Sequence, residues 1–235
     1  MITHIPYSEL GKANHGWLKA NHHFSFAHYY NPKRIGFGKL RVINDDWVAP
    51  NSGFPPHPHH NMEIITFVRS GAITHEDSLG NRGTTQAGEV QVMSAGTGIM
   101  HSEYNLSTEP LTLYQIWIES KQAGVKPRWE SRQFPTESSS SLPLLVSGFE
   151  EDKDNALFIY QDARIYGGQL KSDTTTEHKI QDQAYVLASK GTFEITNGSE
   201  NVRLTQGDGA EITKENSIQI NALEDSEVIV IDVPN

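Results

Sequence analysis

Short apolar and β-branched segments, separated by turns that contain Gly, Asn or Asp, recur from residue 39 to the end of the chain. Residues 40–44, 63–69 and 111–118 are examples from the first half. Val, Ile, Thr and aromatic residues favour strands, and glycine-containing turns favour hairpins. No segment keeps a helical periodicity for more than two turns. The pattern therefore predicts an all-β protein built from sandwiches or barrels.

The two halves of the chain carry similar strand–turn–strand segments. Residues 66–73 resemble residues 185–193, and residues 87–90 resemble residues 206–210. Repetition of this kind indicates that one architecture is built twice.

A change of composition separates the two halves. Residues 119–143 are polar, contain proline and include a run of serines, which is typical of a linker. We therefore predict an N-terminal domain of residues 1–130, a linker of residues 131–150 and a C-terminal domain of residues 151–235.

Composition restricts the partners and the chemistry. The formal net charge of -10 and the lack of a Lys/Arg cluster argue against direct binding of nucleic acid. No apolar run approaches the roughly 20 residues that span a bilayer, and residues 1–6 do not resemble an export signal, so we expect a cytoplasmic protein without a membrane partner. Because the chain has no cysteine, any metal must be bound by nitrogen and oxygen ligands.

Histidine is concentrated in the first half, where ten of the 11 histidines fall within residues 1–101. His57-Pro58-His59 places two imidazoles at spacing two, and Pro58 biases His57 toward extended backbone. His101 and Glu103 have the same spacing. In extended chain, residues at this spacing project from one face. If the two strands lie opposite each other, three imidazoles and one carboxylate converge, which predicts a metal site.

The spacing alone leaves the carboxylate ligand open. If the strand that carries His57 and His59 is unbroken, Glu63 lies on the same face and competes with Glu103, or it holds a ligand imidazole through its free nitrogen. His60 points to the opposite face, and we expect it to face solvent or to be packed. His75 lies on the next predicted strand and is a weaker candidate.

Ligands of this type suit Fe(II), Mn, Co, Ni, Cu or Zn, and the ligand set does not choose among them. Four protein ligands leave positions open on a five- or six-coordinate metal. An iron site next to a carboxylate that accepts a proton can activate an acidic phenol or enol toward O2.

These motifs resemble the pirin family of the cupin superfamily. The resemblance rests on Gly53-x3-His57-Pro58-His59-x3-Glu63 and on residues 96–105, Gly-Thr-Gly-Ile-Met-His-Ser-Glu-Tyr-Asn, and it is close to about residue 135. It implies a bicupin, that is, two tandem antiparallel β-barrel (jelly-roll) domains, with metal in the N-terminal one. It also implies the ligands His57, His59, His101 and Glu103, whereas the older cupin pattern favours Glu63.

The resemblance further implies an oxidoreductase of the quercetin 2,3-dioxygenase (quercetinase) type. One divalent metal, with Fe(II) favoured, would bind a flavonol through its 3-hydroxyl, and Glu103 would act as the catalytic residue by accepting that proton. O2 would then cleave the heterocycle and carbon monoxide would be released. We expect a monomer that takes a flavonol-like aromatic substrate and O2.

Two other functions stay open at this point. Animal members of the family are metal-dependent partners of transcription factors, so the protein could be a redox sensor or regulatory module with a protein partner. A sugar or small-metabolite isomerase on the same scaffold is also consistent with the residues, because a fold does not determine a reaction.

Overall fold

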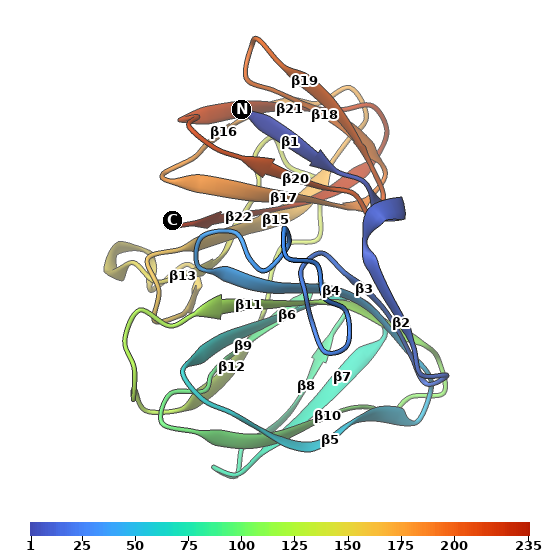
Figure 1. Cartoon of the computed structure of the whole chain (residues 1–235), viewed down its shortest axis with the longest axis vertical. Coiled ribbons are helices and arrows are strands. Elements are labelled where there is room, and N and C mark those ends of the chain that lie inside the picture. The colour runs from blue at the N-terminus through green and yellow to red at the C-terminus, as the bar shows by residue number, and fades with distance from the viewer.

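The computed structural model describes residues 1–235 and contains four β-sheets, arranged as two stacked sandwiches (Figure 1). Each sandwich has one sheet of seven strands and one of four. All strand pairs are antiparallel except β13 with β14. The prediction of an all-β protein with two domains of similar architecture is confirmed. No helix is long and apolar enough to cross a membrane.

The first sandwich carries the histidine-rich stretches. In order across its seven-stranded sheet lie β12 (Arg128–Gln133), β9 (Glu89–Ser94), β6 (Met62–Ser70), β11 (Leu111–Glu119), β4 (Leu40–Val48), β3 (Leu18–His22) and β2 (Gly11–Asn14). Its four-stranded sheet has the order β5 (Ser52–His59), β10 (Ile99–Asn105), β7 (Ala72–Asp77) and β8 (Arg82–Gln86).

The second sandwich is formed mainly by the C-terminal half. Its seven-stranded sheet has the order β1 (Ile2–Ile5), β20 (Gly209–Ile212), β17 (Gln183–Lys190), β22 (Ser226–Val233), β15 (Arg164–Leu170), β13 (Leu144–Ser147) and β14 (Leu157–Phe158). Its four-stranded sheet has the order β16 (Thr175–Lys179), β21 (Ser217–Ala222), β18 (Thr192–Thr196) and β19 (Asn201–Thr205). Two short 3-10 helices, η1 (Tyr7–Glu9) and η2 (Glu150–Asp152), lie in loops.

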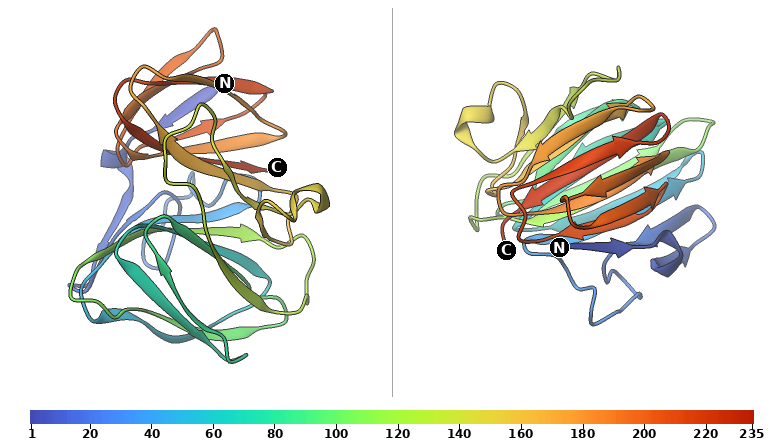
Figure 2. Two further views of the ribbon diagram at one scale, coloured as in Figure 1. Left: turned by 180° about the vertical axis from the view of Figure 1, so that it is seen from behind. Right: turned by 90° about the horizontal axis from the view of Figure 1, so that it is seen from above.

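The largest hydrophobic core lies between the two sandwiches. The seven-stranded sheets occupy the middle of the molecule, and the four-stranded sheets lie at its ends (Figures 1 and 2). A cluster of 22 buried hydrophobic residues draws on both sheets, with Ile43 and Tyr114 from the first and Tyr185 and Ile231 from the second. Burial of this apolar surface holds the two halves together.

The interiors of the two sandwiches differ. The second is filled by a cluster of 17 buried hydrophobic residues, whereas the first contains smaller clusters of five and four. Buried polar residues such as His75, Gln91, His101 and Glu103 occupy much of the first interior. The copy without the histidine motifs therefore has an ordinary apolar core, and the copy with them does not.

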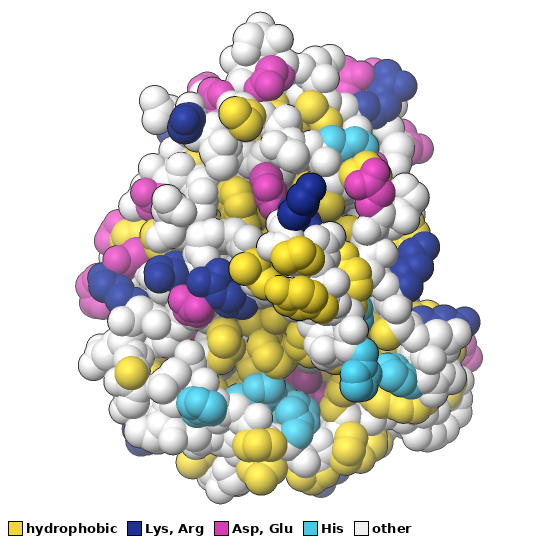
Figure 3. Space-filling model, in the orientation of Figure 1, with side chains coloured by type: hydrophobic (Ala, Val, Ile, Leu, Met, Phe, Trp, Pro, Cys, Tyr) yellow, Lys and Arg dark blue, Asp and Glu magenta, His cyan; other side chains and the backbone are white.

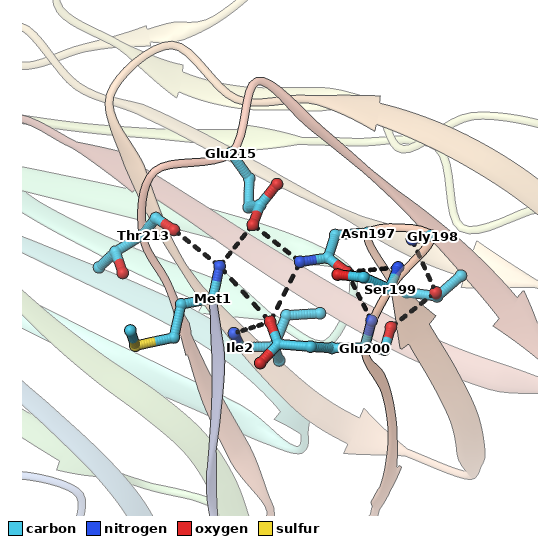
Figure 4. A network of polar contacts seen from close by, with 9 residues as sticks. Met1, Ile2, Asn197, Gly198, Ser199, Glu200, Thr213 and Glu215 are labelled. Atoms are coloured by element: carbon cyan, nitrogen blue, oxygen red, sulfur yellow. Dashed lines mark hydrogen bonds and ion pairs between the residues drawn. The ribbon is translucent and has the colours of Figure 1, made fainter.

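Strand β1 belongs to the second sandwich, which the boundary of residues 1–130 did not anticipate. It pairs with β20 in the register Ile2 to Ile212. The Met1 amine donates to the Thr213 carbonyl at 3.0 Å, and the Ile2 amide donates to Glu200 Oε2 at 2.9 Å (Figure 4). Residues 131–150 are not a plain linker either, because they contain β13 and the end of β12.

Candidate metal centre

Register between β5 and β10 brings the two sequence motifs together. His101 lies directly opposite His57, and His59 lies opposite Ile99. The ring centroids are 4.4 Å apart for His57 and His101, 4.8 Å for His57 and His59, and 5.0 Å for His59 and His101. One ligand nitrogen from each of the three lies within 4.8 Å of the others. The three imidazoles thus converge as their spacing predicts.

Prolines and glycines explain the local backbone. β5 is an edge strand, and Pro55 and Pro56 lie where its register with β10 shifts, an irregularity of the kind at which prolines are tolerated. Gly96, in the turn that leads to β10, has a φ of 49°, and a Cβ there would lie 2.0 Å from the Val125 carbonyl oxygen. Glycine is therefore needed where the chain turns toward His101.

Hydrogen bonds leave the Nε2 atoms of two imidazoles free for a metal. His57 Nδ1 donates to the Pro55 carbonyl at 2.8 Å, so Nε2 keeps its lone pair. His101 Nε2 is buried without any hydrogen-bond partner. A buried nitrogen without a partner is costly, and a metal ion at the centre of the three rings removes that cost. The residues therefore fit a metal.

Two of the three imidazoles, those of His59 and His101, are held neutral, as metal ligands must be. Burial, reinforced by the neighbouring histidines, lowers the pKa of His59 to about 4 and that of His101 to about 2. At neutral pH both rings therefore carry a free lone pair.

His75, a weaker candidate on sequence, is fully buried beside the centre. Its Nε2 donates to Asp77 Oδ2 at 2.9 Å, and its Nδ1 lies 3.4 Å from His101 Nδ1. The ring also stacks on Trp129 with a centroid distance of 5.0 Å. Because His75 Nε2–H donates to Asp77, His75 Nδ1 is free to accept a hydrogen bond from His101 Nδ1–H. His101 Nε2 then faces the other two imidazoles.

Glu103 is also buried and is held by two amides. Gln91 Nε2 donates to Glu103 Oε1 at 2.7 Å, and Gln115 Nε2 donates to Oε2 at 2.6 Å. Burial raises the pKa of Glu103 to about 7, although both amides oppose the increase. Glu103 forms a second cluster of candidate ligands with His75 and His101, whose ligand atoms lie within 4.8 Å of one another. His101 belongs to both clusters, and Glu103 is not grouped with His57 or His59.

Glu63, the competing carboxylate, lies elsewhere. Asn61, with a φ of 49°, turns the chain after β5, so Glu63 falls on β6 in the other sheet. Its Oε2 accepts from Ser94 Oγ at 2.6 Å, and burial raises its pKa. The premise of an unbroken strand was wrong, and Glu63 belongs to neither cluster of candidate ligands. His60 is exposed, which confirms that it faces solvent.

A pocket of about 290 Å³ opens beside the centre. Figure 3 shows histidine and hydrophobic side chains around a hollow on this half of the molecule. The lining comes from β3, β4, β11, β5 and one loop: Leu18, Ala20, His22, Asn44, Asp46, Gln115, Trp117, Phe54, Pro55, Pro56, His57, His59 and Phe26. We call it the aromatic pocket. Its volume is near the lower end of the range for small-molecule sites, about 300–1,000 Å³.

Sequence reasoning missed Gln91, Gln115 and Asp46 as parts of the site. Gln91 and Gln115 each interrupt a mainly apolar strand, and that interruption is the signal that could have indicated a buried polar role. Asp46 follows Asn44 and Asp45, so it lacks this signal. Their partners come from other strands, so spacing along one segment could not identify them.

Two stacked β-sandwiches with a cluster of histidines inside one of them define a double-domain cupin protein with a candidate metal centre. Comparison with known proteins agrees. The Pirin family model matches residues 5–118, and the model described as "Quercetinase C-terminal cupin domain" matches residues 144–233. The chain belongs to the pirin family.

Full-length relatives support this assignment. The chain is 53% identical over 235 residues to a pirin-like protein of Caulobacter vibrioides, covering 99% of each chain. It is 45% identical over 237 residues to quercetin 2,3-dioxygenase of Escherichia coli, covering 100% of this chain and 99% of that one. The crystal structure of the bacterial pirin YhhW from Escherichia coli in complex with nickel(II) superposes with a TM-score of 0.92 at 44% identity, covering 100% of this chain and 99% of that one.

Proposed function

We propose that the protein is a metal-dependent dioxygenase of the pirin-like quercetinase type, which cleaves the heterocycle of a flavonol with O2. The observation that carries the proposal is the three-imidazole cluster at the edge of the aromatic pocket, with Glu103 buried behind His101. The name of the Escherichia coli relative and the nickel(II) complex of a related pirin support it.

His57, His59 and His101 are the proposed metal ligands, and Glu103 is the proposed fourth. The centre takes one divalent transition metal, and we favour Fe(II) in the working enzyme. When bound, such a metal supplies Lewis acidity toward a substrate hydroxyl and redox chemistry toward O2.

The pocket residues bind and orient the substrate. Trp117 packs edge-on against His59 with a centroid distance of 4.9 Å and edge-on against Phe26 at 5.4 Å. These rings, with Phe54, which also lines the pocket, favour a flat aromatic molecule and exclude water from the reacting end.

Glu103 is the proposed proton acceptor for the substrate hydroxyl. Gln91 and Gln115 fix both of its oxygens, which limits its movement. A carboxyl group whose pKa lies near 7 exchanges a proton readily at neutral pH.

The rest of the proposal concerns the whole molecule. We propose that metal binds to the N-terminal sandwich alone, because the second has an apolar interior and its two histidines, His4 and His178, belong to no cluster of candidate ligands. We further propose that the protein acts in the cytoplasm as a monomer on a small aromatic substrate.

The test is oxygen uptake by iron-loaded protein with quercetin, compared with Glu103→Gln at matched metal content. We expect uptake well above that of free iron, and loss of at least a hundredfold in the variant. Uptake no greater than that of free iron would instead favour the regulatory binding module, and turnover without O2 would favour an isomerase.

A further inference from the structure

Two adjacent acidic residues on β4 have opposite environments. Asp45 points to one face of the sheet and forms an ion pair with Arg69. Asp46 points to the other face, where it lines the aromatic pocket and is only 3% exposed. Its Oδ1 is buried and has no hydrogen-bond partner. The pocket therefore contains a carboxyl group that the protein itself does not satisfy.

The buried carboxyl groups of this sandwich differ in their partners. Glu103 accepts at both oxygens from two glutamines, whereas Glu63 accepts from Ser94 at Oε2 and its Oε1 has no partner. Asp46 differs from Glu63 because it lines the aromatic pocket. Leaving a buried polar group without a partner is costly. A ligand that supplies the missing hydrogen bond recovers this free energy on binding.

The residues beside Asp46 do not provide a hydrogen-bond partner for its carboxyl group. Its neighbours in register are Ala20 on β3 and Leu113 on β11, which offer no side-chain hydrogen bond. The nearby polar pair is satisfied internally, because His22 Nδ1 donates to Asn44 Oδ1 at 2.7 Å.

The charge state suits hydrogen bonding to a neutral ligand. Burial, followed by the charges of Asp45 and Glu103, raises the pKa of Asp46 to about 8, while Arg69 opposes the increase. A neutral carboxyl group both donates and accepts, so it can pair with a hydroxyl or a carbonyl oxygen.

We propose that Asp46 is a specificity-determining residue that hydrogen-bonds a second oxygen of the aromatic ligand, distinct from the oxygen that reaches the three imidazoles. The inference rests on the proposed function for the location of the ligand. It adds that the pocket selects aromatic molecules with at least two oxygen substituents over those with one.

The experiment measures binding without turnover. The full-length protein, loaded with metal and kept free of O2, is titrated by calorimetry with quercetin and with 3-hydroxyflavone, which lacks the ring hydroxyls. The variants are Asp46→Leu, which removes the hydrogen bond, and Asp46→Asn, which preserves it. Metal content and thermal unfolding are recorded for each.

We expect Asp46→Leu to weaken quercetin binding about tenfold or more, and Asp46→Asn to stay within about threefold of the parent. If 3-hydroxyflavone is unaffected by Asp46→Leu, the partner is a ring hydroxyl. If it is weakened equally, the partner is the carbonyl shared by both probes.

Unchanged quercetin affinity in a folded, metal-loaded Asp46→Leu protein would overturn the inference, and so would failure of the metal-loaded parent protein to bind either probe. Because binding is measured without O2, the two proposals fail separately. If Asp46→Leu loses affinity for quercetin but the parent protein takes up no oxygen, the proposal of a recognition site stands and the proposal of a dioxygenase fails.

Discussion

His75 Nδ1 and His101 Nδ1 lie 3.4 Å apart inside the first sandwich, and Asp77 holds the other nitrogen of His75. The chain Asp77–His75–His101 fixes which nitrogen of His101 faces the two imidazoles of β5. Such outer partners orient a ligand imidazole and raise its basicity. His75 therefore connects a buried carboxylate to the candidate metal centre.

Replacing His75 should weaken metal binding without removing it. We expect His75→Phe, which keeps an aromatic ring against Trp129, to reduce metal affinity by about 10–100-fold, measured by competition with a chelator. His60→Phe is the control, since His60 is exposed. Equal metal affinity in His75→Phe and His60→Phe would show that His75 contributes packing only and does not orient His101.

The ligands themselves should behave differently. His57→Ala and His101→Ala should each lose bound metal while the cooperative unfolding transition remains, because the main core lies between the sandwiches and not at the centre. Metal per chain, measured by elemental analysis, checks this prediction, with His60→Ala as the matched control. Full metal stoichiometry in both ligand variants would contradict the assignment.

The N-terminal half should not fold alone. Residues 1–143 lack every strand of the second seven-stranded sheet except β1, so Ile43, Ile65, Val92 and Ile116 would be exposed on one face. Exposed apolar surface of this kind promotes aggregation. We expect insoluble protein or no cooperative unfolding, checked by sedimentation and circular dichroism. A soluble, cooperatively folded fragment that binds metal would show that the domains are independent.

His178 should make stability depend on pH. Burial lowers its pKa from 6.5 to about 4, so the unfolded chain binds the proton more readily between these values. Stability is therefore lost as pH falls from about 6.5 toward 4, with a total of about 3 kcal/mol from the separation of the two pKa values.

His178→Phe removes this titration and keeps an aromatic contact with Tyr166, whose ring centroid lies 4.6 Å away. Relative to the parent, the variant should gain about 2 kcal/mol of unfolding free energy between pH 7.5 and pH 5. Urea unfolding at the two pH values checks it, and a parent–variant difference that is the same at both would contradict it.

The sequence predicted the parts of this structure that depend on one strand at a time. His57 and His59 share a face because their spacing is two, and His101 meets them because its strand pairs with theirs. The edge position of β5 is consistent with its prolines. The all-β class and the duplication also follow from local patterns.

Relationships between strands were harder to predict. A single residue with positive φ, Asn61, moved Glu63 to another sheet, and nothing in the spacing marked that turn. Gln91 and Gln115 meet Glu103 only after three strands from two sheets pack together. The place of β1 in the second sandwich could not be predicted, because its partner β20 lies about 200 residues away in sequence. Local patterns carry no information over such a distance.

The most direct test of the proposed function is the ratio of carbon monoxide formed to O2 consumed when metal-loaded protein acts on quercetin. Cleavage of the heterocycle predicts one molecule of carbon monoxide for each O2, and none above background for His101→Ala. Oxygen consumption without carbon monoxide, or the same ratio and rate in His101→Ala, would contradict the proposal that this centre performs flavonol cleavage.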